Sequence, residues 1–177
     1  MNWMLLPLKR YVDFSGRSRR MEYWMFFLAV ILFYFTLVLV AYLLLRGAML
    51  SALEGMDPAA GPGARSTGMM NAALGGGIIG IVMLVTWLAL LIPSIAVGVR
   101  RLHDIDRSGW WLMLGYGPWI LGIVSAIAQS GMLAGILNLA SMIGFIIVVI
   151  FAFLPGTRGP NRFGHDPKGE DLGQVFA

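Results

Sequence analysis

Cysteine is absent from this 177-residue sequence, and charged residues are scarce. Without cysteine the chain has no disulfide, no thiolate nucleophile and no cysteine-ligated metal. Charged residues make up 12% of the chain and hydrophobic residues 58%, whereas about 25% of a typical soluble domain is charged. The mean hydropathy of +0.78 agrees with this imbalance. The composition is that of a membrane protein.

Four apolar stretches are each long enough to cross a membrane, which takes about 20 helical residues. They cover residues 21–45, 74–99, 110–128 and 132–154, and their only charged residue is Glu22, at the rim of the first. Backbone groups in lipid must be hydrogen-bonded within the segment, so such stretches predict helices. The predicted fold class is all-α: a polytopic membrane protein with four transmembrane helices in a bundle.

The segments between these helices complete a single membrane domain over residues 1–177. We predict an interfacial N-terminal segment at 1–20, a cytoplasmic loop at 100–109 and a cytoplasmic tail at 155–177. Residues 46–73 are rich in Gly, Ala and Pro. This composition predicts an external loop that is flexible or only locally helical.

Short connections and small residues predict how the helices pack. Residues 129–131 leave room only for a tight turn, so the third and fourth spans should form an antiparallel hairpin. Two pairs of small residues, Gly76 with Gly80 and Gly122 with Ala126, repeat at four-residue spacing. Such pairs allow two helix backbones to approach closely.

The distribution of Lys and Arg predicts the orientation in the membrane. Eleven of the thirteen lie in the N-terminal segment, the 100–109 loop and the C-terminal tail, whereas the other side carries only Arg46 and Arg65. Positive charge accumulates on the cytoplasmic side, so both termini are predicted to be cytoplasmic. The same bias explains the net charge of +4 without a nucleic-acid partner.

Three polar segments fall on this one membrane face. They are GRSRRMEYW (residues 16–24), RRLHDIDRSGWW (100–111) and GPNRFGHDP (159–167), called here the first, second and third polar segments. Each adjoins the end of a predicted helix. We therefore expect the three to be neighbours in space.

The first polar segment contains a carboxylate that needs a partner. Glu22 lies at the hydrocarbon rim, where an unpaired charge is costly. Arg100 and Arg101, at the end of the second span, are the candidates. Ser18 is placed to cap the first helix, whose dipole Glu22 also complements.

The other two polar segments contain residues typical of helix starts and turns. Asp106 or Ser108 is predicted to cap the third helix, and Trp110 and Trp111 to anchor its start at the interface. In the third segment, Asn161 is expected to bond to nearby backbone within a turn.

These motifs also carry a resemblance. GRSRRMEYWMFF opening the first span, AVGVRRLHDIDRSGWW after the second and GPNRFGHDP after the last closely resemble the small bacterial inner-membrane proteins known as domain-of-unknown-function family 805. The resemblance covers nearly the whole chain. It implies a multi-pass protein of the bacterial inner membrane and assigns no biochemical activity, cofactor or catalytic residue.

Two His-Asp pairs raise the question of metal binding or catalysis. His103-Asp104 and His165-Asp166 offer ligands that suit zinc or manganese, but adjacent helical residues point about 100° apart. We expect no metal and no cofactor. His103 should instead hydrogen-bond within the polar segments, and Asp104 should be held by Arg100, Arg101 or Arg107. Ser108 with His103 is a weak candidate for hydrolysis, because Ser108 has a capping role.

Two hypotheses of function follow. The first is a noncatalytic membrane protein whose polar segments lock the helices and dock a membrane-protein partner or a second copy. The second is a site for an anionic lipid headgroup or small phosphate-bearing ligand at the arginine cluster, because guanidinium groups match phosphate oxygens. A small-solute transporter or a membrane enzyme agrees less well with uncharged spans. The candidate binding residues are Arg17, Arg19, Glu22, Arg100, Arg101, His103, Asp104, Asn161, Arg162 and Asp166.

Overall fold

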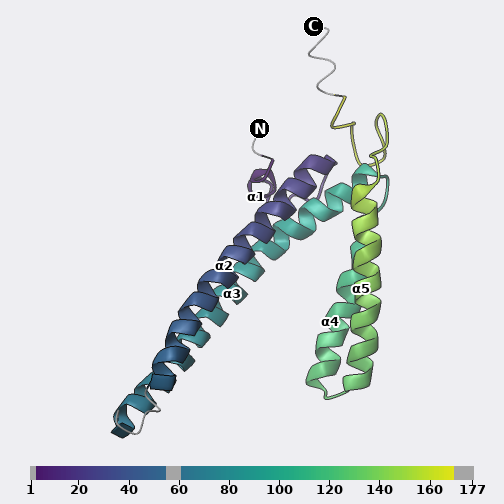
Figure 1. The fold of residues 1–177 in the computed structure, drawn as a ribbon. Coiled ribbons are helices and arrows are strands. Elements are labelled where there is room, and N and C mark those ends of the chain that lie inside the picture. The colour runs from purple at the N-terminus through teal and green to yellow at the C-terminus, as the bar shows by residue number, and fades with distance from the viewer. Residues whose placement is uncertain (1–2, 55–60, 170–177) are drawn as a thin grey trace. The chain divides into compact units, whose positions relative to one another are not determined.

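The computed structural model describes residues 3–54 and 61–169, and this part of the chain is helical apart from turns and one isolated bridge between Asn161 and Gly164. The prediction of an all-α fold is confirmed. Figure 1 shows the elements, which are α1 (Leu6–Lys9), α2 (Arg20–Glu54), α3 (Gly61–Asp104), the 3-10 helix η2 (Gly109–Leu112), α4 (Met113–Ile127) and α5 (Gly131–Phe153).

Four helical stretches are long and apolar enough to span a membrane, as predicted. Many of their large apolar side chains are exposed, including Phe35 at 67% and Ile127 at 78%. Exposed side chains of this kind provide the surface that contacts lipid tails. The spans are Arg20–Gly47, Ala73–Asp104, Gly109–Ile127 and Gly131–Phe153.

The helices are longer than predicted. α2 continues to Glu54 and α3 begins at Gly61, so the described residues of the predicted 46–73 loop are helical. The stretch that follows Gly47 is rich in Ala, Leu and Met, which favour helix more strongly than its scattered glycines oppose it. The rest of the predicted loop, residues 55–60, lies outside the described residues.

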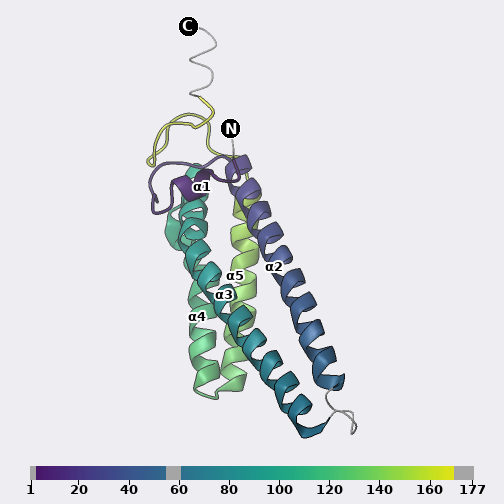
Figure 2. The same ribbon diagram turned by 90° about the vertical axis from the view of Figure 1, so that its left-hand side faces the viewer.

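The chain divides into two compact units. One unit is Leu28–Leu91, and the other combines Met1–Phe27 with Ile92–Ala177. Within Leu28–Leu91, α2 and α3 run side by side in both views (Figures 1 and 2). The close approach predicted at Gly76 and Gly80 is not found: a Cβ at Gly76 would lie 3.9 Å from Leu45, and one at Gly80 would meet no described atom within 4 Å.

α4 and α5 form the predicted antiparallel hairpin and lie side by side in both views (Figures 1 and 2). Gln129, in the turn, has a φ of 59°. Ser141 donates a 2.8 Å hydrogen bond from α5 to the Gly115 carbonyl of α4. Gly144 lies so close to α4 that a Cβ there would overlap the carbonyl oxygen of Leu114. The helices therefore pack backbone to backbone.

A small apolar core fixes the second polar segment against this hairpin. Leu102, Leu112 and Val148 are buried together, and Trp111 and Phe151 pack against them. The core thus joins the last turn of α3, η2 and α5. It holds the end of α3 in place, and the polar side chains of that end form the site described next.

Candidate functional site

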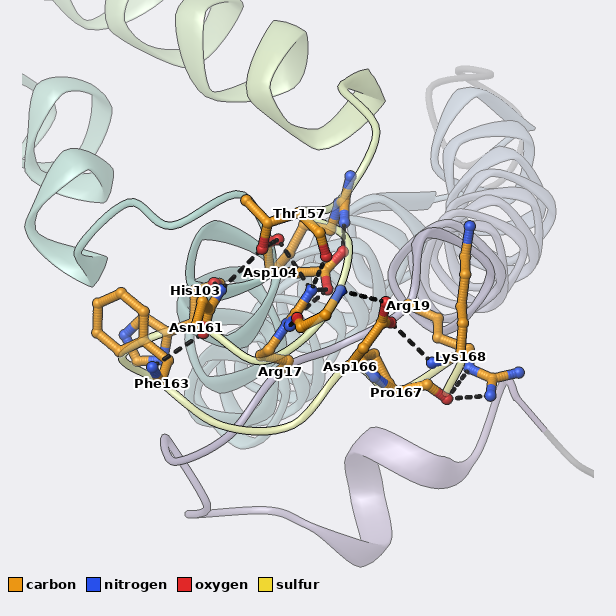
Figure 3. A network of polar contacts seen from close by, with 12 residues as sticks. Arg17, Arg19, His103, Asp104, Thr157, Asn161, Phe163, Asp166, Pro167 and Lys168 are labelled. Atoms are coloured by element: carbon orange, nitrogen blue, oxygen red, sulfur yellow. Dashed lines mark hydrogen bonds and ion pairs between the residues drawn. The ribbon is translucent and has the colours of Figure 1, made fainter. Parts of the chain in front are cut away.

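The site is centred on Asp104, the last residue of α3 (Figure 3). One oxygen of its buried carboxylate accepts a 3.0 Å hydrogen bond from Nε of Arg17, and the other pairs with Nη1 of Arg101. Arg101 is among the predicted partners of Asp104. One carboxylate thus holds an arginine from the first polar segment and one from the second.

The two arginines use their remaining donors on main-chain carbonyls. Arg17 donates to the carbonyl oxygens of Thr157 at 2.6 Å and Gly159 at 2.7 Å. Arg101 donates to those of Ala152 at 3.1 Å and Leu154. Buried cations need partners of this kind. Because these bonds reach the chain on both sides of the α5 terminus, the three polar segments are neighbours, as predicted.

The C-terminal end of α3 is capped by residues more than fifty positions further along the chain. The amide of Thr157 donates to the Asp104 carbonyl at 2.8 Å, and the side-chain amide of Asn161 donates to the His103 carbonyl at 2.9 Å. Asn161 also donates to the Thr157 hydroxyl at 3.0 Å. The last carbonyls of a helix lack partners within the helix. The third polar segment and the residues just before it supply them here.

Gly156 makes this arrangement sterically possible. A Cβ at this position would overlap the carboxylate of Asp104. Only glycine allows the chain after α5 to pass directly over the ion pair. The sequence prediction did not identify Gly156, because a glycine in a polar tail resembles any other turn glycine.

His103 takes a structural position in the site. Its Nδ1 lies 3.2 Å from the carbonyl oxygen of Gly16, and since a carbonyl only accepts, Nδ1 is the donor. The ring stacks on Phe163, with centroids 3.8 Å apart and planes 4° from parallel. Both contacts agree with the prediction that His103 bonds within the polar segments. Among the side chains that the structure describes, no three of His, Cys, Asp or Glu gather as a metal site requires.

The third polar segment forms turns around Asn161 and Asp166. Asn161 accepts a 2.9 Å hydrogen bond from the amide of Phe163, as predicted for a turn. Asp166 accepts bonds from the amides of Lys168 at 2.9 Å and Gly159 at 3.1 Å. These backbone donors, that of Lys168 first, lower the pKa of Asp166 below its usual range. Asp166 therefore holds the fold of this segment as a carboxylate.

Arg162 and Arg19 lie at the edges of the site. Arg162 pairs with Asp106 at 3.0 Å, and both side chains are largely exposed. Arg19 donates to the carbonyl oxygen of Pro167. In Figure 3, Arg19, Pro167 and Lys168 lie at one end of the network, and His103 and Phe163 lie at the other.

Glu22 has the partner that its position required. Its Oε1 lies 3.2 Å from Nη2 of Arg100, and the two side chains are 4% and 0% exposed. The pair is within ion-pair distance but is not aligned as a hydrogen bond. Arg100 otherwise donates only a long 3.4 Å bond from Nε to the Ala96 carbonyl, among the bonds described. The pair is therefore held mainly by charge.

The two predicted serine caps are wrong. α2 begins at Arg20, two residues beyond Ser18, whose hydroxyl is buried without a hydrogen bond to any described atom. Its amide instead donates to the Arg100 carbonyl at 3.1 Å, which ties the first polar segment to the second. Ser108 does stand at the N-cap position of η2, but its side chain makes no capping bond.

We predict that Glu22→Ala and Arg100→Ala are non-additive. Each single variant leaves one buried charge unpaired, whereas the double variant leaves neither. The loss of unfolding free energy in the double variant should therefore be smaller than the sum of the two single losses by about 0.5–3 kcal/mol. The four proteins are compared by unfolding in detergent. The matched cycle is Arg10→Ala with Asp13→Ala, an ion pair whose side chains are each 36% exposed. That cycle should couple by less than about 1 kcal/mol. Additivity at Glu22 and Arg100 would contradict the buried pair.

Comparison with known proteins identifies the family to which this chain is similar. Residues 11–165 match the family described as protein of unknown function DUF805. The inner membrane protein YhaH of Escherichia coli strain K12 is 36% identical over 168 residues, which are 95% of this chain and 98% of YhaH. The inner membrane protein YhaI of the same strain is 32% identical over 173 residues, 95% of this chain and 97% of YhaI. No solved structure matches the chain.

The matched region contains the first two polar segments and most of the third, together with the four spans. Nearly the full length of each of these two relatives is aligned. Family match and structure thus agree with the resemblance seen in the motifs. The chain belongs to the DUF805 family and is a multi-pass protein of the bacterial inner membrane.

Proposed function

We propose that this protein is a noncatalytic scaffold of the inner membrane, whose polar segments lock helix ends and present an ordered cytoplasmic surface for docking. The observation that carries this proposal is the position of Asp104. Its carboxylate pairs with Arg17 and Arg101, and its carbonyl accepts from Thr157. One buried residue thus joins three distant parts of the chain, an arrangement that fixes a surface.

The partners of the candidate catalytic groups support a structural role. Hydrolysis needs a nucleophile, a base and an orienting group within reach of each other. His103 is engaged by Gly16 and Phe163, and Asp104 by two arginines. The residues that the sequence offered for chemistry therefore have roles in holding the chain together.

The polar side chains of the spans support the same interpretation. Thr36, Thr86, Ser125 and Asn138 each donate to the carbonyl four residues earlier in their own helix. Back-bonding of this kind satisfies a hydroxyl or amide locally. Transport of ions or protons ordinarily uses ionisable groups inside the membrane, and these side chains are not ionisable. A structural role accounts for them.

The docking surface proposed here lies on the face that carries the polar segments. The asymmetry of Lys and Arg supports its placement in the cytoplasm. The surface includes the exposed pair of Asp106 and Arg162. Exposed charges on a rigid base favour specific association. The occupant is a membrane-protein partner or a second copy of the chain.

Single cysteines on this cysteine-free chain test both orientation and docking. A membrane-impermeant maleimide should label Arg162→Cys in inverted vesicles and leave it unlabelled in intact spheroplasts. A photoactivatable cross-linker attached at position 162 should then give one discrete product in membranes. Asp104→Asn should abolish this product, because the surface no longer has a fixed base.

The control is Gly63→Cys, an exposed position in the first turn of α3. It should be labelled in spheroplasts and give no product of the same size. Labelling of position 162 from outside the cell would overturn the orientation. A smear of products, or a product that persists in Asp104→Asn, would overturn docking to an ordered surface.

A further inference from the structure

A basic pocket of about 230 Å³ lies beside the Asp104 network. One wall is the start of α2, with Arg19 and Arg20, and the other is the chain after α5, from Pro155 to Arg158 and from Asp166 to Lys168. All of these residues belong to the unit that combines Met1–Phe27 with Ile92–Ala177. Pockets for drug-sized ligands hold about 300–1,000 Å³. This one suits a smaller group.

The positive charge of the pocket lining favours an anionic ligand. Four cationic side chains contribute to the pocket, those of Arg19, Arg20, Arg158 and Lys168. Arg158 and Lys168 are exposed and lie outside the ion pairs of the described chain. Guanidinium and ammonium groups around one small space match the oxygens of a phosphate group.

The two carboxylates in the lining offset only part of this charge. Asp104 is already paired with Arg17 and Arg101. Asp166 accepts hydrogen bonds from the backbone amides of Gly159 and Lys168. Both carboxylates are therefore directed toward partners within the protein. Four cationic side chains against two carboxylates leave the lining with a net positive charge, which attracts an anion.

The pocket lies at the ends of two of the candidate membrane spans. Its lining includes Arg20, the first residue of the α2 span, and Pro155, which follows Phe153, the last residue of the α5 span, by two positions. A 3.3 Å hydrogen bond from Arg20 Nη1 to the Phe153 carbonyl links these two ends. Basic pockets between membrane helices at this depth are typical sites for anionic lipid headgroups.

We propose that this pocket binds a phosphate group, carried by the headgroup of an anionic phospholipid or by a small soluble phosphate compound. The site shares Arg19 with the arginine cluster that the sequence favoured but leaves out Arg17, Arg100 and Arg101. Arg17 and Arg101 are turned toward Asp104, and Arg100 toward Glu22. The ligand instead meets Arg19 and Arg20 on one side and Arg158 and Lys168 on the other.

The test uses the full-length protein and a double variant, Arg158→Gln with Lys168→Gln. Both side chains are exposed, so the variant should keep the fold and the thermal midpoint of the wild type. The control double variant, Lys9→Gln with Arg162→Gln, removes the same charge from exposed positions outside the pocket. The lipid probe is a nanodisc of phosphatidylglycerol and phosphatidylcholine, from which the protein is released for native mass spectrometry.

The wild type should retain phosphatidylglycerol in preference to phosphatidylcholine. The pocket variant should lose at least about tenfold of this retention, because each cation near the surface contributes about 1 kcal/mol to headgroup binding. The control variant should lose clearly less of its phosphatidylglycerol retention. Equal loss of retention in both variants would mean that the basic face as a whole attracts phosphatidylglycerol. That result would overturn the proposal of a specific site in the pocket.

A second arm separates the two sources of phosphate. Inorganic phosphate is titrated into the detergent-solubilised protein while the thermal midpoint is followed. A rise in the thermal midpoint of the wild type that is absent from the pocket variant indicates that the ligand is a soluble phosphate compound. Lipid retention without this rise assigns the headgroup, whose glycerol and acyl chains then add to binding. Absence of both responses from the wild type would overturn the proposal.

Discussion

Replacement of Asp104 by asparagine is expected to lower the free energy of unfolding by about 3–5 kcal/mol. The carboxylate is buried and each of its oxygens accepts from a buried arginine. The asparagine amide is isosteric, but its NH₂ group would face a guanidinium, so two donors would oppose each other. Arg17 and Arg101 would also lose their shared anion. Unfolding of the purified protein in detergent, followed by circular dichroism, measures the loss.

The matched control is Asp106→Asn, two residues away. Asp106 pairs with Arg162, but their side chains are 47% and 61% exposed. Water replaces the lost interaction there, and the cost should be at most about 1 kcal/mol. Similar losses for the two variants would contradict the central role of Asp104. The difference between them isolates the effect of burial, because the chemical change is the same.

The number and position of the spans could be predicted because lipid imposes a simple requirement. Every backbone group must be bonded within its own segment, and charge is excluded. The stretch from Trp110 to Ala128 is uncharged, and so is the stretch after the short turn. These local properties were sufficient to predict the hairpin of α4 and α5. The helical extension to Glu54 was missed because scattered Gly, Ala and Pro were taken to indicate a loop.

The partner of Glu22 could also be predicted. The argument used the free-energy cost of an unpaired charge and not a sequence pattern. A carboxylate at the hydrocarbon rim requires a cation. The end of the second span, on the same predicted face, offered Arg100 and Arg101. The structure selects Arg100. The reasoning succeeded because few cations were available at that depth.

The contacts of Arg17 could not be predicted in the same way. It lies 87 residues from Asp104 and about 140 from Thr157 and Gly159. Its partners depend on how the chain returns after α5, which local sequence does not encode. Counting arginines on one face also gave no means of separating buried from exposed ones. The ligand hypothesis therefore included Arg17 and Arg101, whose donors are engaged inside the protein.

The strongest steric prediction concerns Gly144, in the middle of α5. Gly144→Ala should destabilise the protein by about 3 kcal/mol or more, at the upper end of the usual cost of overpacking. The new methyl group would overlap the carbonyl oxygen of Leu114 in α4. A backbone atom has no rotamer that relieves this overlap, so the two helices must separate. Separation also stretches the 2.8 Å bond from Ser141 to the Gly115 carbonyl.

Gly135→Ala on the same helix provides the control. A Cβ at Gly135 would meet no described atom within 4 Å. Alanine there should stabilise the helix by about 0.5–1 kcal/mol, because it restricts the unfolded chain. The same substitution is thus expected to have opposite signs at two positions of α5, measured by unfolding in detergent. A stabilising effect at both positions would mean that α4 and α5 do not approach closely at Gly144. Opposite signs would locate the contact that holds the hairpin together, since lipid supplies no hydrophobic force between the helices.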